Sequence, residues 1–358
     1  MKLLVLSKYG RKGASSRLRF MQYLPALKAA GIDAQVSSLL DDDYLQAIYS
    51  GVSGSQYALR GYFRRLRDLL GTFVPDVIWL EKEAFPFAPH WLETRLLSRK
   101  VPVVSDFDDA VFHNYDLHRY GLVRRLLGDK IDRVMASSAL VMAGNAYLAQ
   151  RARQAGAASV EIVPTVVDAS AYNVFPRSET ERRARIGWVG TPSTWRRYMV
   201  PMLPMLTSLA RQHGAVIRNV GGATSEAPHP YLEVLPWSED REVQFIQEMD
   251  IGLMPLDDSP WSRGKCGFKL IQYMACGLPV VASPVGVNAE IVEHGVNGFL
   301  ATTEEEWREA ISRLLGDPSL RLHMGATGRQ KVEQQFSLQV WAPRVARLLK
   351  SVVEGGRR

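Results

Sequence analysis

Short apolar runs alternate with amphipathic or polar segments along the first half of the chain. Each run is four to eight residues long and is bounded by glycine, proline or charged residues, which is typical of strands buried inside an α/β domain. The segments between them have the apolar spacing of helices that cover a sheet. The pattern predicts six strands, at residues 2–7, 33–39, 76–81, 102–107, 139–145 and 159–168.

The same strand-first pattern begins again after a polar, charged segment at residues 176–185, which we interpret as a linker. Two strand-first units in one chain predict an α/β protein with two Rossmann-like, doubly wound domains that face each other across a cleft. We expect the domains to span residues 1–180 and 181–340. The strands predicted for the second domain lie at residues 186–190, 215–222, 231–237, 251–258 and 279–282.

The most informative stretch runs from Arg263 to Gly298. A basic loop punctuated by glycine leads into a helix of about ten residues, which Gly277 and Pro279 should end. A short apolar strand and a second loop follow, and this loop leads into a helix at residues 289–293. Helix N-termini carry free N–H groups and positive dipole ends, so two of them at one sheet edge predict a site for a phosphate-bearing ligand.

This stretch closely resembles the donor-site signature FKLLEYMACGLPVVAS of the retaining family 4 glycosyltransferases, which are group 1 glycosyltransferases with the GT-B fold. Here it reads FKLIQYMACGLPVVAS from Phe268, and the resemblance is strongest over residues 251–300. The resemblance implies transfer of a hexose from a nucleotide diphosphate sugar to an acceptor hydroxyl, with retention of anomeric configuration. It also implies that no metal or other cofactor is needed and that the acceptor is a carbohydrate or a lipid-linked intermediate. A C-terminal helix at 341–358, which Pro343 should bend, is expected to cross back and pack on the first domain.

The resemblance also assigns donor-binding positions. Arg196 takes the place of a lysine six residues after Gly190, and arginine suits phosphate through its two-pronged geometry. The two glutamates of the family's E-x7-E motif are replaced by Gly264 and Gln272. Gln272 is therefore expected to accept a hydrogen bond from a ribose hydroxyl, without the assistance of a negative charge. The full donor-binding set is Gly13, Gly190, Thr191, Arg196, Lys265, Gly267, Phe268, Lys269 and Gln272.

An acidic DFDD sequence follows the fourth predicted strand and should therefore lie at the ligand crevice of an open sheet. Asp108 and Asp109 stand where the family often has a His-Asp pair, and we assign both, with Lys265, to catalysis. The role of Asp108 stays open between a base for the acceptor hydroxyl, a sugar contact, a Mg²⁺ ligand and a helix cap. We expect the acceptor side to comprise Ser15, Ser16, Arg17 and Asp106.

Charge is distributed unevenly. The net charge is +7, and residues 1–185 hold 26 Lys and Arg against 19 Asp and Glu, whereas the second half is balanced. Two basic segments, 56–71 and 118–133, contain apolar residues at helical spacing, so they are either membrane-surface helices or ordinary helices packed on the sheet with arginines outward. Nucleic-acid binding is not expected, because the basic residues are not interleaved with a stacking platform.

Other features set the expected location. No apolar run approaches the ~20 residues that span a bilayer, and the N-terminus becomes polar too early for a signal peptide. The two cysteines, Cys266 and Cys276, lack the spacing of a zinc site and fit a reducing compartment. We therefore expect a cytoplasmic protein, with peripheral attachment to the inner face of the membrane if the basic segments bind lipid.

Two other functions remain open at this level. A non-catalytic nucleotide-sugar-binding subunit would explain the missing E-x7-E acids. A non-hydrolysing sugar-nucleotide epimerase would share the same architecture.

Overall fold

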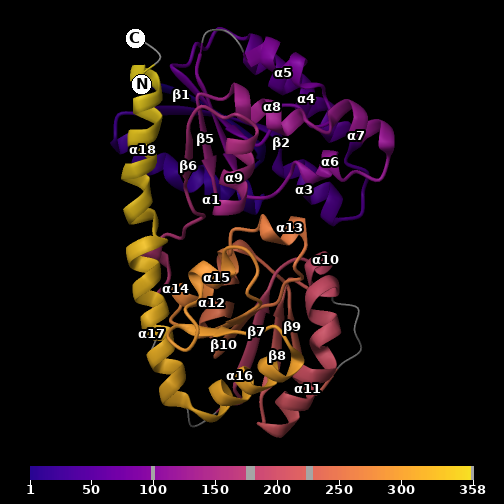
Figure 1. Cartoon of the computed structure of the whole chain (residues 1–358), viewed down its shortest axis with the longest axis vertical. Helices are drawn as coiled ribbons and strands as arrows, with labels where there is room; N and C mark the ends of the chain where they lie inside the picture. Colours follow the sequence, from indigo (N-terminus) through magenta and orange to yellow (C-terminus); the bar gives the residue numbers. More distant parts are fainter. Residues whose placement is uncertain (98–100, 175–181, 223–228, 356–358) are drawn as a thin grey trace. The chain divides into compact units, whose positions relative to one another are not determined.

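The computed structural model describes residues 1–97, 101–174, 182–222 and 229–355. Contacts group the chain into unit 1, with Met1–Val166, Gly264–Cys266 and Leu338–Arg358, and unit 2, with Val167–Arg263 and Gly267–Ser337. Each unit has its own sheet covered by helices (Figure 1). The predicted domain limits at residues 180 and 340 differ from these contact boundaries and stay predictions; residues 176–181 of the predicted linker lie outside the described residues.

The sheet of unit 1 has six strands in the order β2-β1-β3-β4-β5-β6, with every neighbouring pair parallel. All six predicted strands are present, although β6 is much shorter than predicted. The strands are β1 (Lys2–Tyr9), β2 (Asp33–Leu40), β3 (Val77–Glu81), β4 (Val103–Phe107), β5 (Leu140–Ala143) and β6 (Val160–Ile162).

Helices cover both faces of this sheet. Leu4 and Leu6 of β1 pack into one apolar cluster, whereas Leu3 and Val5 pack into another on the opposite face, as the two-residue period of a strand requires. The helices are α1 (Ala14–Arg19), α2 (Leu24–Ala29), α3 (Asp42–Tyr49), α4 (Ser55–Leu70), α5 (His90–Leu97), α6 (His113–Asp116), α7 (Gly121–Leu127), α8 (Lys130–Ser137), α9 (Ala146–Gln154) and α18 (Leu338–Gly355).

The C-terminal helix α18 belongs to unit 1. Its buried residues, which include Val345 and Leu349, join the cluster that contains Leu3 and Val5 of β1. The helix continues through Pro343 as one element. The predicted packing of a C-terminal helix on the first sheet is confirmed.

Unit 2 repeats the architecture with the strand order β12-β11-β10-β7-β8-β9, again entirely parallel. The sequence pattern missed β12, which is a three-residue edge strand containing Gly298 and is too short to show periodicity. The strands are β7 (Arg185–Val189), β8 (Val216–Val220), β9 (Leu232–Leu235), β10 (Ile251–Met254), β11 (Val280–Ala282) and β12 (Gly298–Leu300).

The helices of unit 2 also pack on two faces. One apolar cluster takes residues from α12, α14 and α17, and the other takes residues from α11 and α16. These helices are α10 (Pro192–Thr194), α11 (Leu203–Gln212), α12 (Glu239–Gln247), α13 (Pro260–Arg263), α14 (Phe268–Ala275), α15 (Asn288–Ile291), α16 (Glu304–Gly316) and α17 (Pro318–Gln335). Together the two sheets confirm the predicted α/β class with two doubly wound parallel domains.

The predicted end of α14 is confirmed in detail. Gly277 has φ 69°, and its N–H donates to Met274 O while the N–H of Leu278 donates to Tyr273 O. This is the Schellman arrangement, which needs a left-handed residue and therefore favours glycine.

None of the described helices is both long and apolar enough to cross a bilayer.

Candidate functional site

The strand order places one ligand crevice in each sheet. In unit 1 the chain turns back between β1 and β3, and in unit 2 between β7 and β10. In doubly wound sheets ligands bind beyond the carboxyl ends of the strands at such a switch point. The candidate residues therefore fall into two groups, the loops after β1, β3 and β4 in unit 1 and the loops after β7 and β10 in unit 2.

The loop after β1 is tightly built. A Cβ on Gly13 would lie 2.3 Å from Tyr9 Cβ, so only glycine fits there without a shift. Ser16 is fully buried, accepts from the N–H of Tyr9 at 2.9 Å and donates to Glu81 Oε2 at 2.5 Å. Arg17 is also buried. Ser16 therefore holds the loop against β3, whereas Arg17 donates to Arg11 O within the loop. The burial of both residues does not favour the predicted contact with the acceptor, which stays a prediction.

Asp106 needs a similar correction. It is 1% exposed, and both of its carboxylate oxygens bind the guanidinium of Arg19, at 2.8 and 3.0 Å. Arg19 also donates to Val163 O at 2.7 Å. This buried pair joins α1, β4 and the segment after β6, so Asp106 has a structural role and not the predicted acceptor contact.

Asp108 and Asp109 have different surroundings although they are adjacent. Lys82 Nζ lies 2.7 Å from Asp108 Oδ1, and Ser15 Oγ donates to Asp108 Oδ2. Burial alone would raise the pKa of Asp108, but the charges of Lys82 and Arg19 together with hydrogen bonds from Lys82 and Ser15 outweigh it and lower the pKa to about 2. Asp108 is therefore a permanently charged carboxylate with both oxygens engaged inside unit 1.

Asp109 is the more open of the two. Its side chain is 32% exposed, and the nearest cation is the ammonium of Lys265, whose Nζ lies 4.0 Å from Asp109 Oδ1. Burial and the neighbouring Asp108 charge raise the pKa of Asp109. The structure thus brings together Ser15, Asp108, Asp109 and Lys265 from the predicted set, and Asp109 is the more exposed of the two aspartates.

Sequence reasoning missed Glu81 and Lys82, which lie at the switch point itself. Both are buried, and Glu81 Oε2 accepts from the N–H of Lys8 at 2.7 Å. Their place at the end of a predicted strand was visible, but the partners that bury their charges are up to 73 residues away in the chain. Local pattern could not show that these charges face inward.

In unit 2 the loop after β7 forms a helix cap. Thr191 Oγ1 accepts from the N–H of Thr194, whose hydroxyl in turn accepts from the N–H of Thr191 at 3.1 Å. Gly190 is half-buried beside the ring of Trp188, which a Cβ would approach to 2.5 Å. Gly190 therefore makes room for the Trp188 ring and Thr191 caps α10, and their place in the donor site stays a prediction.

The two arginines that follow differ in their contacts. Arg197 is ion-paired with Asp257 at 2.5 Å. Arg196 is exposed, and its Nε donates to Pro192 O at 3.3 Å. Of this pair, Arg196 is the one without a carboxylate partner within the residues that the structure describes, and its place in the donor site stays a prediction.

The loop after β10 leads to the N-terminus of α14. Gly267 has φ 65° at the N-cap, and a Cβ there would lie 2.3 Å from Ile291 Cδ1, so glycine is required on both counts. Phe268 is half-buried, and Lys269 Nζ lies 4.6 Å from the centre of the Trp188 ring. Gln272 is 2% exposed and donates to Tyr172 OH at 3.2 Å. The predicted ribose contact of Gln272 therefore does not fit, because its amide is enclosed within unit 2.

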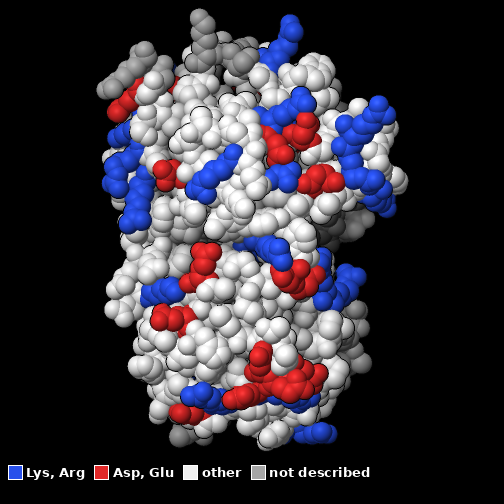
Figure 2. All heavy atoms as spheres, in the orientation of Figure 1, with Lys and Arg blue, Asp and Glu red and all other residues white. Residues whose placement is uncertain are grey.

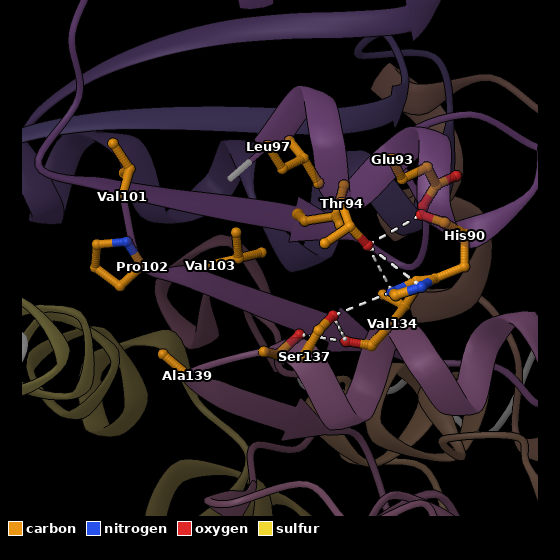
Figure 3. A pocket seen from close by; sticks show the side chains of 12 residues that line it. His90, Glu93, Thr94, Leu97, Val101, Pro102, Val103, Val134, Ser137 and Ala139 are labelled. Atoms are coloured by element: carbon orange, nitrogen blue, oxygen red, sulfur yellow. Dashed lines mark hydrogen bonds between the residues drawn. The ribbon is translucent and has the colours of Figure 1, made fainter. Parts of the chain in front are cut away.

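Cavities give little further guidance. One of about 330 Å³ lies at the carboxyl edge of β10 and β11 and includes Tyr198, Asp257 and Trp307. Another, of about 250 Å³, lies between α5 and α8 and contains none of the predicted site residues (Figure 3). Its polar residues His90, Thr94 and Ser137 hydrogen-bond one another, so it needs no ligand to satisfy them.

Within the residues that the structure describes, no group of three or more His, Cys, Asp or Glu side chains has the geometry of a metal site.

Residues 184–317 match the family model described as glycosyl transferases group 1. Among curated proteins, D-inositol 3-phosphate glycosyltransferase 1 of Catenulispora acidiphila is 26% identical over 327 residues, which is 75% of this chain and 72% of that protein. The human alpha-1,3/1,6-mannosyltransferase ALG2 is 33% identical over 82 residues, 23% of this chain and 19% of that protein. The matched regions of the first three curated relatives cover 19% to 32% of their length.

Solved structures extend the likeness to the whole fold. The crystal structure of Anabaena HepE in complex with UDP-glucose aligns with a TM-score of 0.72 at 18% identity and covers 98% of this chain and all of the other. The two six-stranded parallel sheets are the GT-B arrangement. The chain has the GT-B fold of these solved structures, and its residues 184–317 match the group 1 glycosyltransferase model.

Proposed function

We propose that this protein transfers a hexose from a nucleotide diphosphate sugar to an acceptor hydroxyl, with retention of anomeric configuration. One observation carries the proposal: the family match at 184–317 includes both loops at the switch point of unit 2, with Gly190–Thr191 after β7 and Gly267 at the start of α14. Backbone N–H groups and small residues at such an edge suit a pyrophosphate.

The chemistry asks the protein to stabilise negative charge that grows on the leaving diphosphate. We propose Arg196 of unit 2 as a cation for this charge, and Lys265, which belongs to unit 1 by its contacts, as a second donor residue to be tested separately. We propose that Asp109, which is partly exposed, accepts a hydrogen bond from a hydroxyl of the sugar or the acceptor. A carbohydrate or a lipid-linked intermediate is the proposed acceptor.

The experiment is a thermal-shift screen with UDP-, GDP-, ADP- and dTDP-sugars, followed by an assay of nucleotide release with glycan and glycolipid acceptors. A ligand that binds only the folded protein raises the melting temperature. Release of nucleotide that depends on acceptor, and that is equally fast in EDTA and in Mg²⁺, supports the proposal. Binding without release favours the non-catalytic subunit, and epimer formation without acceptor favours the epimerase.

Arg196→Ala and Lys265→Ala test the proposed donor contacts. Each charged hydrogen bond is worth about 1.5–3 kcal/mol, so we expect each variant to raise the donor Kd about tenfold. Titration calorimetry measures the change, and Arg211→Ala, an exposed arginine on α11, is the matched control. An unchanged Kd in either variant would remove that residue from the site.

We also propose that unit 1 contacts an anionic membrane. Helix α7 has no buried residue and exposes Leu122 and Leu126, at 68% and 65%, beside Arg124 and Arg125. Lys and Arg side chains gather over the edge of unit 1 where α7 lies (Figure 2). An exposed leucine surface with flanking arginines is typical of helices at a lipid interface.

The second basic helix, α4, has a mixed character. Arg65 is 1% exposed and donates to Ser37 O, and Arg64 pairs with Asp41, so these two arginines serve the fold. Leu59 and Phe63 remain exposed on the outer face. We therefore propose α7 as the main membrane contact of the two predicted segments, with α4 as an accessory.

Leu122→Glu with Leu126→Glu tests this proposal. Burying a leucine is worth about 1.5–3 kcal/mol, so the double variant should lose at least about tenfold in partition to vesicles that contain anionic lipid. Leu322→Glu, an exposed leucine of unit 2, is the control and should leave partition unchanged. Sedimentation with vesicles measures the effect, and equal partition of the double variant and the wild type would contradict the membrane role.

A further inference from the structure

Lys82 occupies an unusual backbone position at the end of β3. Its φ is 64°, and the N–H of Glu83 donates to Glu81 O at 2.7 Å, which closes a three-residue turn centred on Lys82. Within the described residues only Lys82 and Phe87 combine a side chain with positive φ. Such turns are rare and strained, and they persist where the surrounding contacts require them.

The contacts of the Lys82 ammonium explain why this strained turn persists. The side chain is 7% exposed, and Nζ lies 2.7 Å from Asp108 Oδ1, 3.4 Å from Ser15 Oγ and 4.0 Å from Glu81 Oε1. One cation therefore joins the loops after β1, β3 and β4, which are the three segments of the unit 1 crevice.

These contacts give the two adjacent aspartates, Asp108 and Asp109, different surroundings. Lys82 and Ser15 engage one oxygen each of Asp108, so that carboxylate is held inside the unit. Asp109 follows directly in the chain and stays partly exposed. Because both oxygens of Asp108 are held, the backbone segment that carries Asp109 is held as well.

Lys82 also sets the charge that Asp109 experiences. Burial opposes the charge of Lys82, but Asp108 and Asp109 outweigh it and raise the pKa of the ammonium, so Lys82 stays protonated. By the same interaction Lys82 counteracts the rise in the pKa of Asp109. The ionisable groups that surround this cluster are Lys8 and Tyr9 of β1, Arg19 of α1, Glu81 and Glu83 at the end of β3, Asp106 of β4, Lys265 and Cys266.

We propose that Lys82 is a positioning residue for the proposed transfer reaction: through Asp108 and Ser15 it holds the crevice loops together, so that Asp109 is presented to the substrate as a carboxylate. The inference rests on the proposed function. It assigns to Lys82 no contact with substrate.

Lys82→Met tests the inference, because methionine has a similar length and no charge. We expect kcat to fall about tenfold or more with the donor KM unchanged within about twofold, since misplacing a substrate contact by a small distance has this cost. The acid limb of the pH profile should move upward by about one unit, because a nearby cation shifts a carboxylate by about that amount. Lys82→Arg keeps the positive charge, so the acid limb of its pH profile should lie at the same pH as in the wild type.

The controls separate this role from a purely structural one. Lys28→Met, on the exposed side of α2, should change neither rate nor pH profile. Ser15→Ala removes the weaker of the two contacts to Asp108, a hydrogen bond. It should shift the acid limb of the pH profile in the same direction as Lys82→Met, but by less. A Lys82→Met enzyme with a normal rate, or with a lower rate and an unmoved acid limb, would overturn the inference.

A titration of the aspartate side-chain carbons by NMR needs no turnover. If the wild-type protein transfers no sugar, the proposed function fails, but an upward shift of the Asp109 titration in Lys82→Met still supports the electrostatic part of the inference. An unshifted Asp109 titration in a folded Lys82→Met protein would refute it whatever the activity.

Discussion

Asp109→Asn is expected to lower kcat about 100-fold, because one preorganised charged contact to the reacting groups is worth about 10²–10³ in rate. The asparagine side chain has nearly the same shape as aspartate and can still accept a hydrogen bond, but it carries no charge. The donor Kd should change little, since the cations at the donor edge are untouched. Steady-state rates at saturating donor measure the effect.

The pH dependence gives this variant a second readout. Burial and the Asp108 charge raise the pKa of Asp109, so in the wild type activity should fall as pH drops through a value above the ordinary ~3.9 of aspartate. Asp109→Asn has no proton to take up there, and its residual activity should lack that acid limb. A kcat within threefold of wild type would remove Asp109 from the reaction.

Asp108→Asn is the informative comparison. It leaves the buried Lys82 ammonium without its 2.7 Å partner, so we expect a lower melting temperature as well as lower activity. Asp109→Asn removes a carboxylate whose charge the fold disfavours, so it should leave the melting temperature unchanged or raise it slightly. The pair of variants separates a carboxylate that serves substrate from one that serves the fold.

Lys130→Met is expected to destabilise the protein by about 3–5 kcal/mol at neutral pH, the usual cost of removing one partner from a buried ion pair. Lys130 Nζ lies 2.5 Å from Glu83 Oε2 and 2.9 Å from Glu93 Oε1, and its side chain is 1% exposed. Without the ammonium, two carboxylates remain in the core between α5, α8 and β3. Urea unfolding followed by circular dichroism measures the loss.

The sign of the pH effect can be worked out. Burial already raises the pKa of Glu93 against the opposing effect of Lys130, and removal of Lys130 raises it further. A carboxyl with a raised folded-state pKa carries no penalty below its unfolded pKa of ~4.3, and the penalty grows as pH rises toward the folded-state pKa. The destabilisation should therefore be small near pH 4 and largest at pH 7.

Arg133→Met is the matched control on the same helix. Its pair with Asp129 is exposed at both ends, and such pairs contribute less than about 1 kcal/mol. Adding Glu83→Gln and Glu93→Gln to Lys130→Met should recover part of the stability, because the uncompensated charges are removed. Equal stabilities for Lys130→Met and Arg133→Met would show that the buried cluster does not stabilise the fold.

The sequence determined most of the architecture, because its signals are local. Continuous apolar runs located eleven of the twelve strands, and the glycine and proline after α14 located its C-terminus. The motif from Phe268 onward also pointed to the family before any geometry was known. Each of these rests on residues within about one turn of helix or one strand of each other.

The tertiary structure alone decided which charges face ligand and which face the core. The DFDD motif was visible in the sequence. However, Asp106 is hydrogen-bonded to Arg19, 87 residues earlier, and Asp108 to Ser15, 93 residues earlier. Nothing in the local sequence indicates that Lys82 and Lys130 are buried against carboxylates. The role of a carboxylate depends on the cation nearest to it in space. In a doubly wound sheet the strand order brings together segments that are far apart in the sequence, and no periodic pattern of residues predicts which segments meet.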